Sequence, residues 1–496
     1  MDRIHHYLDA QRGTRPDALA FTDSIGTRWT YAQLATAVED LANVLSDQGV
    51  RAGDRVMVLV ENCAATVACI FASSQLDACI VPINARQTAR EIARIIAHAD
   101  PAVVLATTAV STDAQAHAEV LQAKPVSGAF GQMHIAVRAS NPDEDPNVAV
   151  QLYTTGTTGT PKGVMLTHAN VLFGGRSAAT LRDMQPEDVI YGVLPVTHVF
   201  GLSSVVMAAV YAGAPVRFEA RFSAEKLYRA LTEGVTLLSA VPQMHALLMQ
   251  YTKEQGYDRL PSDTLRYVSS GAAPLDPTWK AKAEAFYGVA IQNGYGMTET
   301  TAGTCVTRNR VGDPDISVGP PLPGVEIAID ETVAGGGAGV GEVLTRGPHI
   351  MKGYYRNPDE TAKVLDAKGW MHTGDLGRID TKGNLHILGR SKELIIHGGF
   401  NVYPPEVEAA LNDHPQVIQT AVIGQMVGGD EIVLAFCQVA PNDRPEESAL
   451  RNYAAERLAG YKRPSRIIVA TDLPAAPTGK ILKHKLLEHF AAELLA

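Results

Sequence analysis

The sequence predicts an α/β fold: a large N-terminal domain of layered sheets and helices, followed by a small α+β domain. Helix-like and strand-like segments alternate through the first third of the 496 residues, which is typical of parallel sheets covered by helices. From about residue 376 short strands alternate with helices, and the unit that follows a boundary near Arg390 has about 105 residues, a usual length for one domain. We therefore predict domains at 1–390 and 391–496.

Apolar periodicity and turn residues define the N-terminal elements. Segment 28–49 (RWTYAQLATAVEDLANVLSDQG) predicts an amphipathic helix that ends at Gly49, and 55–60 (RVMVLV) predicts a buried strand. Segments 88–100 and 101–107 predict the next helix and strand. Further strands, each followed by small residues, are predicted within 237–242, 265–274 and 290–296. Ligands of such sheets bind where the strands end and the loops begin.

The C-terminal elements are shorter. Strands are predicted within GNLHILG (383–389), ELIIHGG (393–399), QTAVIGQ (419–425) and IVLAFCQVA (432–440). Helices are predicted within PPEVEAALNDH (404–414), EESALRNYAAERLAG (446–460) and ILKHKLLEHFAAELLA (481–496).

Composition excludes several classes of protein. The net charge of −10 disfavours a nucleic-acid partner. The five cysteines form no CxxC or zinc spacing, so we expect buried thiols in a reducing compartment. The first residues lack the apolar core of a signal peptide, and we predict a cytoplasmic protein. Val199 to Val216 carries no formal charge and is barely long enough to span a bilayer. We predict a buried helix there and no integral membrane association.

The loop at 153–164, YTTGTTGTPKGV, concentrates glycines and hydroxyls around one lysine. A surface turn is one interpretation, because Gly, Thr and Pro form turns. An anion-binding loop is the other, because glycine amides, threonine hydroxyls and a lysine together suit phosphate oxygens. The spacing differs from a Walker loop: Pro161 precedes Lys162 and Gly163 follows it. The loop alone leaves both interpretations open.

Seven further motifs follow in order. They are PVTHVFG (195–201), SSGAAP (269–274), NGYGMTET (293–300), GEVLTRGPHIMKGYY (341–355), HTGDLGRID (372–380), GRSKELIIHGGFNVYPPEVE (389–408) and PTGKILK (477–483). In this order and spacing they resemble the adenylate-forming (AMP-binding) superfamily, which includes acyl-CoA synthetases, adenylation domains of peptide synthetases and beetle luciferases. The resemblance spans nearly the whole chain and favours the acyl-CoA synthetase branch.

The resemblance implies two half-reactions, with ATP, Mg²⁺ and CoA. A carboxylate oxygen attacks the ATP α-phosphorus and pyrophosphate leaves. A thiol then attacks the acyl-adenylate and AMP leaves. Neither step needs a covalent protein nucleophile, so catalysis rests on alignment and charge stabilisation. The small domain is expected to be mobile between the two steps.

By this resemblance, several motifs bind the nucleotide. The β- and γ-phosphates would be held by Thr154, Thr155, Gly156, Thr157, Thr158 and Lys162. Adenine would stack on Tyr295, with Asn293, Gly294, Gly296, Gly271, Ala272 and Ala273 around it. Asp375 would accept both ribose hydroxyls, since an ionised carboxylate is acceptor-only, and Arg390 would donate to the same ribose.

The remaining roles are also implied by the resemblance. Lys480 would bridge the attacking carboxylate and the α-phosphate, Thr298 would donate to that phosphate, and Glu299 would bind Mg²⁺. Lys392 would be the hinge between the domains, and Gly398 and Gly399 would line the pantetheine tunnel. Candidate cations for the CoA phosphates are Arg86, Lys462 and Arg463.

Ordinary structural roles remain open for these residues. They are a surface ion pair for Asp375 and Arg390, a packed ring for Tyr295, a helix cap for Glu299, a core histidine for His198, a plain turn for Gly398–Gly399 and a solvated surface lysine for Lys480.

The acid is expected to be a monocarboxylate, medium-chain or aryl. Residues 197–201 carry no carboxylate for an amino-acid ammonium. The resemblance places an arginine just before the YGMTE-type motif in malonyl-CoA-type synthetases, but this chain has Asn293-Gly294, and a buried second carboxylate would lack its charge partner. His198 would gate a pocket lined by Val199, Phe200, Val241, Met244, Ala272 and Met297.

Four alternatives stay open: a dicarboxylate (malonyl/oxalyl-type) CoA synthetase, a ligase that loads a carrier protein, a luciferase-like oxygenase and a non-catalytic nucleotide-binding protein. We expect a monomer or homodimer.

Overall fold

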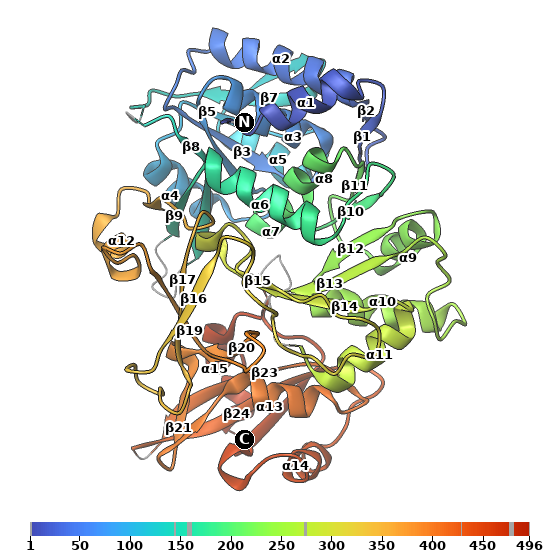
Figure 1. Cartoon of the computed structure of the whole chain (residues 1–496), viewed down its shortest axis with the longest axis vertical. Coiled ribbons are helices and arrows are strands. Elements are labelled where there is room, and N and C mark those ends of the chain that lie inside the picture. The colour runs from blue at the N-terminus through green and yellow to red at the C-terminus, as the bar shows by residue number, and fades with distance from the viewer. Residues whose placement is uncertain are drawn as a thin grey trace.

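The computed structural model describes residues 2–142, 145–155, 161–271, 275–427, 429–475 and 481–495. Its N-terminal part stacks two eight-stranded sheets, with helices between them and on both outer faces (Figure 1). A four-stranded sheet and a separate C-terminal unit complete the chain. The predicted mixed α/β architecture, a large N-terminal domain with a small C-terminal one, is confirmed.

The first large sheet is mostly parallel. Its order is β15 (Cys305–Val306), β14 (Ile291–Tyr295), β13 (Tyr267–Gly271), β12 (Leu237–Ala240), β10 (Ile190–Gly192), β11 (Val216–Phe218), β1 (Leu19–Thr22) and β2 (Arg28–Thr30). Only the edge strands β15 and β2 pair antiparallel.

The second large sheet has a parallel centre and antiparallel edges. Its order is β18 (Gly353–Tyr354), β9 (Pro161–Thr167), β8 (Val148–Thr155), β4 (Cys79–Asn84), β3 (Arg55–Val60), β5 (Val103–Ala106), β7 (Gly131–Val137) and β6 (Lys124–Gly128). Strands β8, β4, β3 and β5 pair in parallel. All the strands predicted in the N-terminal part are present.

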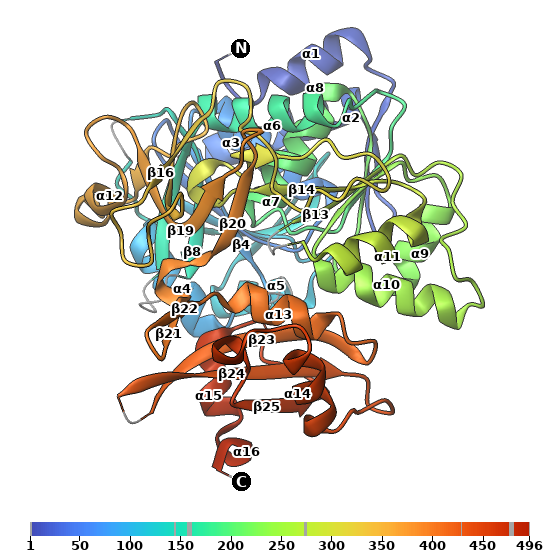
Figure 2. The same cartoon turned by 60° about the horizontal axis from the view of Figure 1, so that its bottom comes forward.

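Alternate residues of β3 serve two different cores, because successive side chains of a strand point to opposite faces. Val56, Val58 and Val60 belong to the core between the sheets, with α2 (Tyr31–Asp47), α3 (Ala64–Gln75), α6 (His168–Leu181) and α8 (Ala208–Ala212). Met57 and Leu59 pack against α4 (Ala89–Ala99) and α5 (Thr112–Val120). The outer face of the first sheet is covered by α9 (Ala224–Thr232), α10 (Pro242–Glu254) and α11 (Pro277–Tyr287) (Figure 2).

The first predicted helix begins later than the sequence pattern indicates. Residues 28–30 form β2, and α2 begins only at Tyr31. Thr30 caps it: the hydroxyl of Thr30 accepts from the amide of Gln33, whose side chain accepts from the Thr30 amide. This capping box defines the first turn more sharply than apolar periodicity does.

Most of the uncharged stretch from Val199 to Val216 forms a largely buried helix that contains a π-helical segment. It comprises α7 (Val199–Gly201), a π-helical segment (Leu202–Met207) and α8, and the left-handed Gly213 (φ 76°) ends it before β11. The π-helical residues are all buried. Within the described ranges, no helix is long and apolar enough to cross a membrane. All five cysteines are free thiols in buried positions, as predicted.

The four-stranded sheet joins the two parts of the chain. Its order is β16 (Glu326–Asp330), β17 (Gly341–Arg346), β19 (Met371–Ile379) and β20 (Leu385–Arg390), and α12 (Pro358–Val364) lies between β18 and β19 in the sequence.

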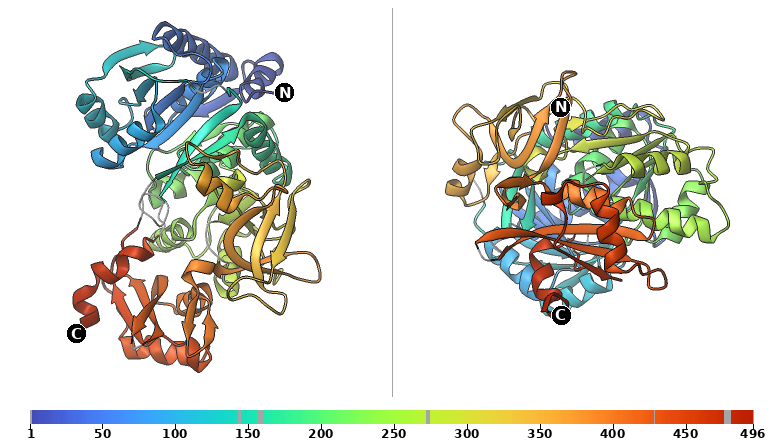
Figure 3. Two further views of the ribbon diagram at one scale, coloured as in Figure 1. Left: turned by 90° about the vertical axis from the view of Figure 1, so that its left-hand side faces the viewer. Right: turned by 90° about the horizontal axis from the view of Figure 1, so that it is seen from below.

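The C-terminal unit has its own core. It contains the hairpin β21 (Ile395–His397) and β22 (Phe400–Val402), and the sheet β23 (Val417–Val427), β24 (Asp430–Val439) and β25 (Arg466–Ala470). Helices α13 (Pro404–Asn412) and α14 (Glu447–Ala455) pack on this sheet. The unit lies at one end of the molecule, opposite the N-terminus (Figures 1 and 3).

The predicted helix over 481–496 is wrong as a single element. The described residues form a 3₁₀ turn (Lys483–Lys485) and two short helices, α15 (Leu486–His489) and α16 (Ala491–Leu495). The break at Phe490 allows its ring to pack against Phe436 of β24, with centroids 5.4 Å apart. Tertiary packing therefore overrides a continuous helical pattern here.

Candidate active site

Two neighbouring parallel strands, β13 and β14, end side by side. Gly271 pairs with Gly294 at their carboxyl ends. A Cβ at Gly271 would lie 3.1 Å from Cε1 of Phe200, so glycine allows that ring to approach the strand end. At Gly296 a Cβ would lie 2.0 Å from the carbonyl oxygen of Ala302, so only glycine fits. This strand end is where such a sheet is expected to bind ligands.

Tyr295, Asp375 and Arg390 converge beside this edge. The Tyr295 hydroxyl donates to Oδ2 of Asp375 at 2.6 Å, and Nε of Arg390 lies 3.2 Å from Oδ1. Asp375 stands opposite Arg390 in the β19–β20 register and is buried. Burial, followed by the Asp375 charge, raises the pKa of Tyr295, so the phenol stays a neutral donor. Two predicted nucleotide residues from different sheets, Tyr295 and Arg390, therefore share the carboxylate of a third, Asp375.

Glu299 is a second buried carboxylate in the same region. It lies in a 3₁₀ turn (Thr298–Thr300) after β14, and 8% of its surface is exposed. Tyr354 of β18 donates its hydroxyl to Oε1 at 2.8 Å. No lysine or arginine among the described residues forms an ion pair with it. A buried carboxylate with free acceptor capacity fits Mg²⁺, which usually takes one or two protein carboxylates. Thr298, also buried, precedes it.

The predicted phosphate loop connects β8 to β9. These strands pair antiparallel, with Thr154 opposite Lys162 and Thr155 opposite Pro161. Residues 156–160, which include Gly156, Thr157 and Thr158, lie outside the described residues, as does the side chain of Thr155. The Nζ atom of Lys162 lies 2.5 Å from Oε2 of Glu360 and 4.9 Å from the centroid of the Tyr354 ring.

Most of the predicted acid-binding residues border one hydrophobic core. Phe200, Val241 and Met244 are partly buried and pack against the same core, to which buried Val199 belongs. Met297 is partly buried just after β14, and Ala272 and Ala273 lie outside the described residues. His198 is exposed at the start of α7, so a core histidine is excluded.

The side chain of Asn293, which is predicted to lie at the edge of adenine, is buried and hydrogen-bonded to the protein. Asn293 is 1% exposed. Its Nδ2 donates to the carbonyl oxygen of Ser317 at 3.1 Å, and its Oδ1 accepts from the amide of Gly294 at 3.0 Å. One protein partner at each end of the amide fixes the side chain of Asn293 at the end of β14. The amide keeps a second N–H and a second acceptor site, so its adenine role stays a prediction.

The Gly398–Gly399 pair forms the turn of the β21–β22 hairpin. Both residues have positive φ, 58° and 80°, as a two-residue hairpin turn of type I′ requires. The amide of Gly398 donates to the carboxylate of Asp430 at 3.0 Å, and both glycines are exposed. The turn interpretation is therefore sufficient for this conformation, and the pantetheine tunnel stays a prediction. Lys392 is exposed in a 3₁₀ turn (Ser391–Glu393), and Lys480 lies outside the described residues.

The candidate cations for CoA phosphates all have protein partners. Arg86 lies 3.5 Å from Glu61, and Lys462 lies 2.5 Å from Glu406. Arg463 donates to the carbonyl oxygens of Leu458 and Ala455, just beyond the end of α14. The contacts of Arg463 are those of a residue that stabilises the end of a helix.

Sequence reasoning missed Tyr354 and Glu360. Tyr354 is within a quoted motif, but nothing in the spacing indicates that its hydroxyl reaches Glu299. Glu360 follows that motif and lies 198 positions from Lys162 in the sequence. Only the pairing of β18 with β9, with Tyr354 opposite Val164, brings these residues together.

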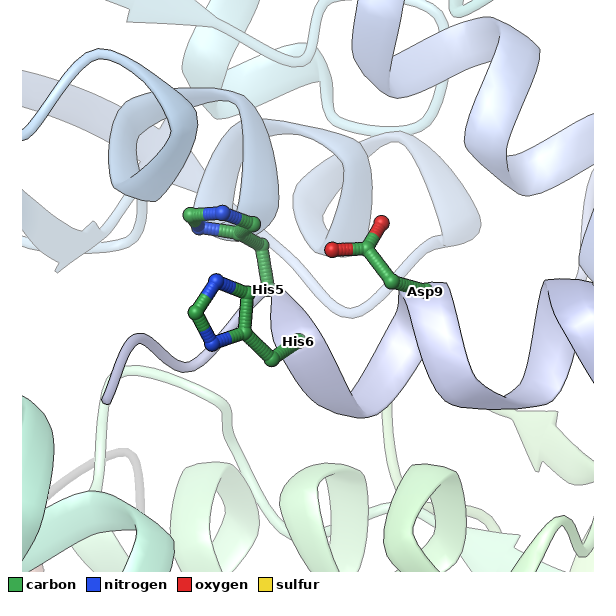
Figure 4. A group of neighbouring side chains, drawn as sticks. All are labelled: His5, His6 and Asp9. Carbon is green, nitrogen blue, oxygen red and sulfur yellow. The ribbon is translucent and has the colours of Figure 1, made fainter. Parts of the chain in front are cut away.

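A separate cluster, His5, His6 and Asp9, lies at the start of α1 (His6–Thr14) (Figure 4). Its potential ligand atoms are within 4.8 Å of one another. However, Nδ1 of His6 accepts from the amides of Asp2 and Arg3, at 3.2 and 3.4 Å. Nε2 is therefore the only nitrogen of the His6 ring left for a metal ion, and in the neutral ring it carries the proton. We assign no metal to this cluster.

Comparison with known proteins identifies the class. The chain belongs to the AMP-binding enzyme family: the model of that family matches residues 8–355, and the model of the AMP-binding enzyme C-terminal domain matches residues 406–480. Within it, the chain lies in the acyl-CoA ligase branch.

Relatives across this branch act on different acids. The chain is 33% identical to a feruloyl-CoA synthase from Amycolatopsis sp., over 94% of both chains. It is 32% identical to a long-chain-fatty-acid–CoA ligase from Mycobacterium tuberculosis, over 99% of both. The structure of the Bacillus subtilis o-succinylbenzoate CoA synthetase with ATP and magnesium ion matches with a TM-score of 0.81 and 27% identity, over 97% of this chain and 98% of that one.

Proposed function

We propose that this protein joins a medium-chain or aryl monocarboxylic acid to CoA through an acyl-adenylate, releasing pyrophosphate and then AMP. ATP-dependent acid–CoA ligation is the activity of the branch to which the chain belongs. The observation that carries the proposal is the convergence of Asp375, Tyr295 and Arg390 beside the β13–β14 edge, with Glu299 in the next turn.

Each residue would contribute binding or charge. Asp375 would accept the ribose hydroxyls, with Arg390 as its cation. Glu299 would be the carboxylate ligand of Mg²⁺, which supplies charge neutralisation at the phosphates when bound. Lys162 would hold the β- and γ-phosphates, and Lys480 would align the acid with the α-phosphate. These are positioning and electrostatic roles, which suits a reaction without a covalent protein nucleophile.

The proposed acid class rests on the side chains predicted to line the acid pocket. Phe200, Val241, Met244 and Met297 offer apolar and aromatic surface, and methionine adapts to varied shapes. Position 293 carries an asparagine engaged with Ser317 and Gly294, not a cation that could pair with a second carboxylate. Apolar monocarboxylates therefore suit these side chains better than dicarboxylates do.

We also propose that the chain divides at 390/391 and turns about Lys392. Arg390 ends the strand that carries half of the ribose site, and the exposed 3₁₀ turn that follows leads directly into the C-terminal hairpin. Hinges are commonly such element-terminal positions. We propose a cytoplasmic location because the cysteines are free and buried, as is usual in a reducing compartment.

The test is pyrophosphate release with ATP and Mg²⁺ over a panel of acids, with and without CoA. The panel holds medium-chain acids, hydroxycinnamic and benzoic acids, malonate and oxalate. We expect release with an apolar monocarboxylate and its conversion to the thioester by CoA. Release with malonate or oxalate alone would overturn the acid class. Adenylate that CoA does not consume, but a carrier protein does, would overturn the choice of acceptor.

A further inference from the structure

Lys162, the cation of the predicted phosphate loop, is held by two neighbours from a distant part of the chain. Its ammonium contacts Oε2 of Glu360 at 2.5 Å and lies over the Tyr354 ring, 4.9 Å from the centroid. The Lys162 and Glu360 side chains are 20% and 29% exposed. The Glu360 carboxylate is therefore already paired with Lys162, the lysine that the proposed function assigns to the phosphates.

The backbone places both neighbours firmly. Tyr354 is fixed by the β18–β9 pairing, and its amide donates to the Thr361 hydroxyl at 2.9 Å. Glu360 lies in the first turn of α12, where its amide donates to the Asn357 side chain. Strand and helix thus hold both the Tyr354 ring and the Glu360 carboxylate beside the Lys162 ammonium.

Glu360 also contacts a second cation. Its carboxylate can therefore separate from Lys162 and still keep a charged partner. Its other oxygen, Oε1, contacts Nζ of Lys363 one turn later. The Lys162 contact, followed by the Lys363 contact, lowers the pKa of Glu360 to about 2, so the carboxylate stays ionised at neutral pH. If Lys162 moves to a phosphate, Glu360 keeps a partner and is not left as an unpaired charge.

Tyr354 also connects Lys162 to Glu299. Its hydroxyl donates to Oε1 of Glu299 at 2.8 Å, while its ring faces Lys162. Tyr354 is 6% exposed, so the ring has little room to move.

We infer that Glu360 is a resting counter-ion of Lys162 that nucleotide phosphates displace, and that Tyr354 is a positioning residue that holds Lys162 and Glu299 in fixed relation. This inference rests on the proposed function. Its consequence is that Glu360 competes with ATP and weakens ATP binding, whereas Tyr354 supports the carboxylate that binds Mg²⁺.

The first test compares Glu360→Gln with Asp359→Asn by calorimetric titration with ATP and Mg²⁺, without acid or CoA. Asp359 is exposed in the same helical turn. Asp359→Asn makes the same change in net charge as Glu360→Gln. We expect Glu360→Gln to bind ATP about two- to fivefold more tightly than wild type, the range of a partly exposed ion pair. Asp359→Asn should match wild type.

Equal affinities for the two variants, or weaker binding by Glu360→Gln, would overturn the competition between Glu360 and ATP. A wild-type protein that binds no ATP would overturn the proposed function, and this inference with it. The two failures are therefore distinguishable in one titration series.

The second test separates the two contacts of Tyr354. Tyr354→Phe keeps the ring beside Lys162 but removes the hydroxyl from Glu299; Tyr354→Leu removes both. For Tyr354→Phe we expect the Mg²⁺ concentration that half-saturates ATP binding to rise about tenfold, the loss of one hydrogen bond to a charged group, with Mg²⁺-free ATP binding unchanged. Tyr354→Leu should weaken both. An unchanged Mg²⁺ requirement in a folded Tyr354→Phe protein would overturn the positioning role.

Discussion

Asp375→Asn is expected to weaken ATP binding by about ten- to a hundredfold, because it removes the charge of a carboxylate that accepts several hydrogen bonds. The carboxylate of Asp375 meets both the Tyr295 hydroxyl and the Arg390 guanidinium. An amide of the same size keeps an acceptor for Tyr295 but leaves Arg390 without its counter-charge. The measurement is the dissociation constant for ATP, with the thermal midpoint recorded beside it.

The control is Asp380→Asn, at the turn of the same β19–β20 hairpin. Asp380 lies 3.0 Å from His386 and accepts from the amides of Lys382 and Asn384, so it stabilises the turn. We expect this variant to lower thermal stability and leave ATP affinity unchanged. Equal loss of ATP affinity in both variants would mean that Asp375 acts through the fold of the hairpin and not through the ribose.

Glu299→Gln should reduce the adenylation rate by about a hundredfold or more, the usual cost of removing one group that stabilises developing charge. It should also flatten the dependence of that rate on Mg²⁺ concentration. Thermal stability should be unchanged or raised. The reason is that Glu299 is buried without a cation among the described residues, so the amide removes a desolvated charge while Tyr354 can still donate to its oxygen.

Glu284→Gln is the matched control, because Glu284 is also a buried glutamate but has structural partners. It contacts Nζ of Lys280 at 2.6 Å and accepts from the amides of Ile291 and Gly312. Breaking this buried pair should destabilise the protein by about 3 kcal/mol and leave the Mg²⁺ dependence intact. A Glu299→Gln variant that loses stability but keeps its Mg²⁺ dependence would show that Glu299 is structural too.

The sequence predicts the layered fold well because its signals are local. The continuous apolar run of β3 and the strongly amphipathic α4 are each visible within a short window, and both elements are where they were predicted. The errors are at element boundaries. Thr30 starts α2 through a capping box, and the C-terminal helix is interrupted at Phe490, whose ring packs against Phe436. Both depend on contacts that periodicity does not report.

The candidate site is predictable only in part. The family motifs single out Asp375, Tyr295, Arg390 and Glu299, and the structure groups the first three around one carboxylate. The bond of Asn293 to Ser317 was not predicted, because Ser317 is brought to it by the loop that follows β15. Sequence spacing cannot show such a partner.

The contacts around Lys162 show the same limit for long-range pairs. Lys162 and Glu360 are 198 positions apart, and Glu299 and Tyr354 are 55 apart. Their meeting depends on the short strand β18, which pairs with β9 over only two residues. A two-residue strand carries no periodic signal, so neither contact could be derived from the sequence.

In the proposed adenylation, a carboxylate oxygen of the acid attacks the α-phosphorus of ATP. Mass spectrometry of the products with an ¹⁸O-labelled carboxylic acid tests it most directly, using the acid identified by the panel and Lys480→Ala as the comparison. We expect that one ¹⁸O atom appears in AMP, that none appears in pyrophosphate, and that the variant forms little labelled AMP. Label in inorganic phosphate with ADP as the other product, or unlabelled AMP, would contradict it.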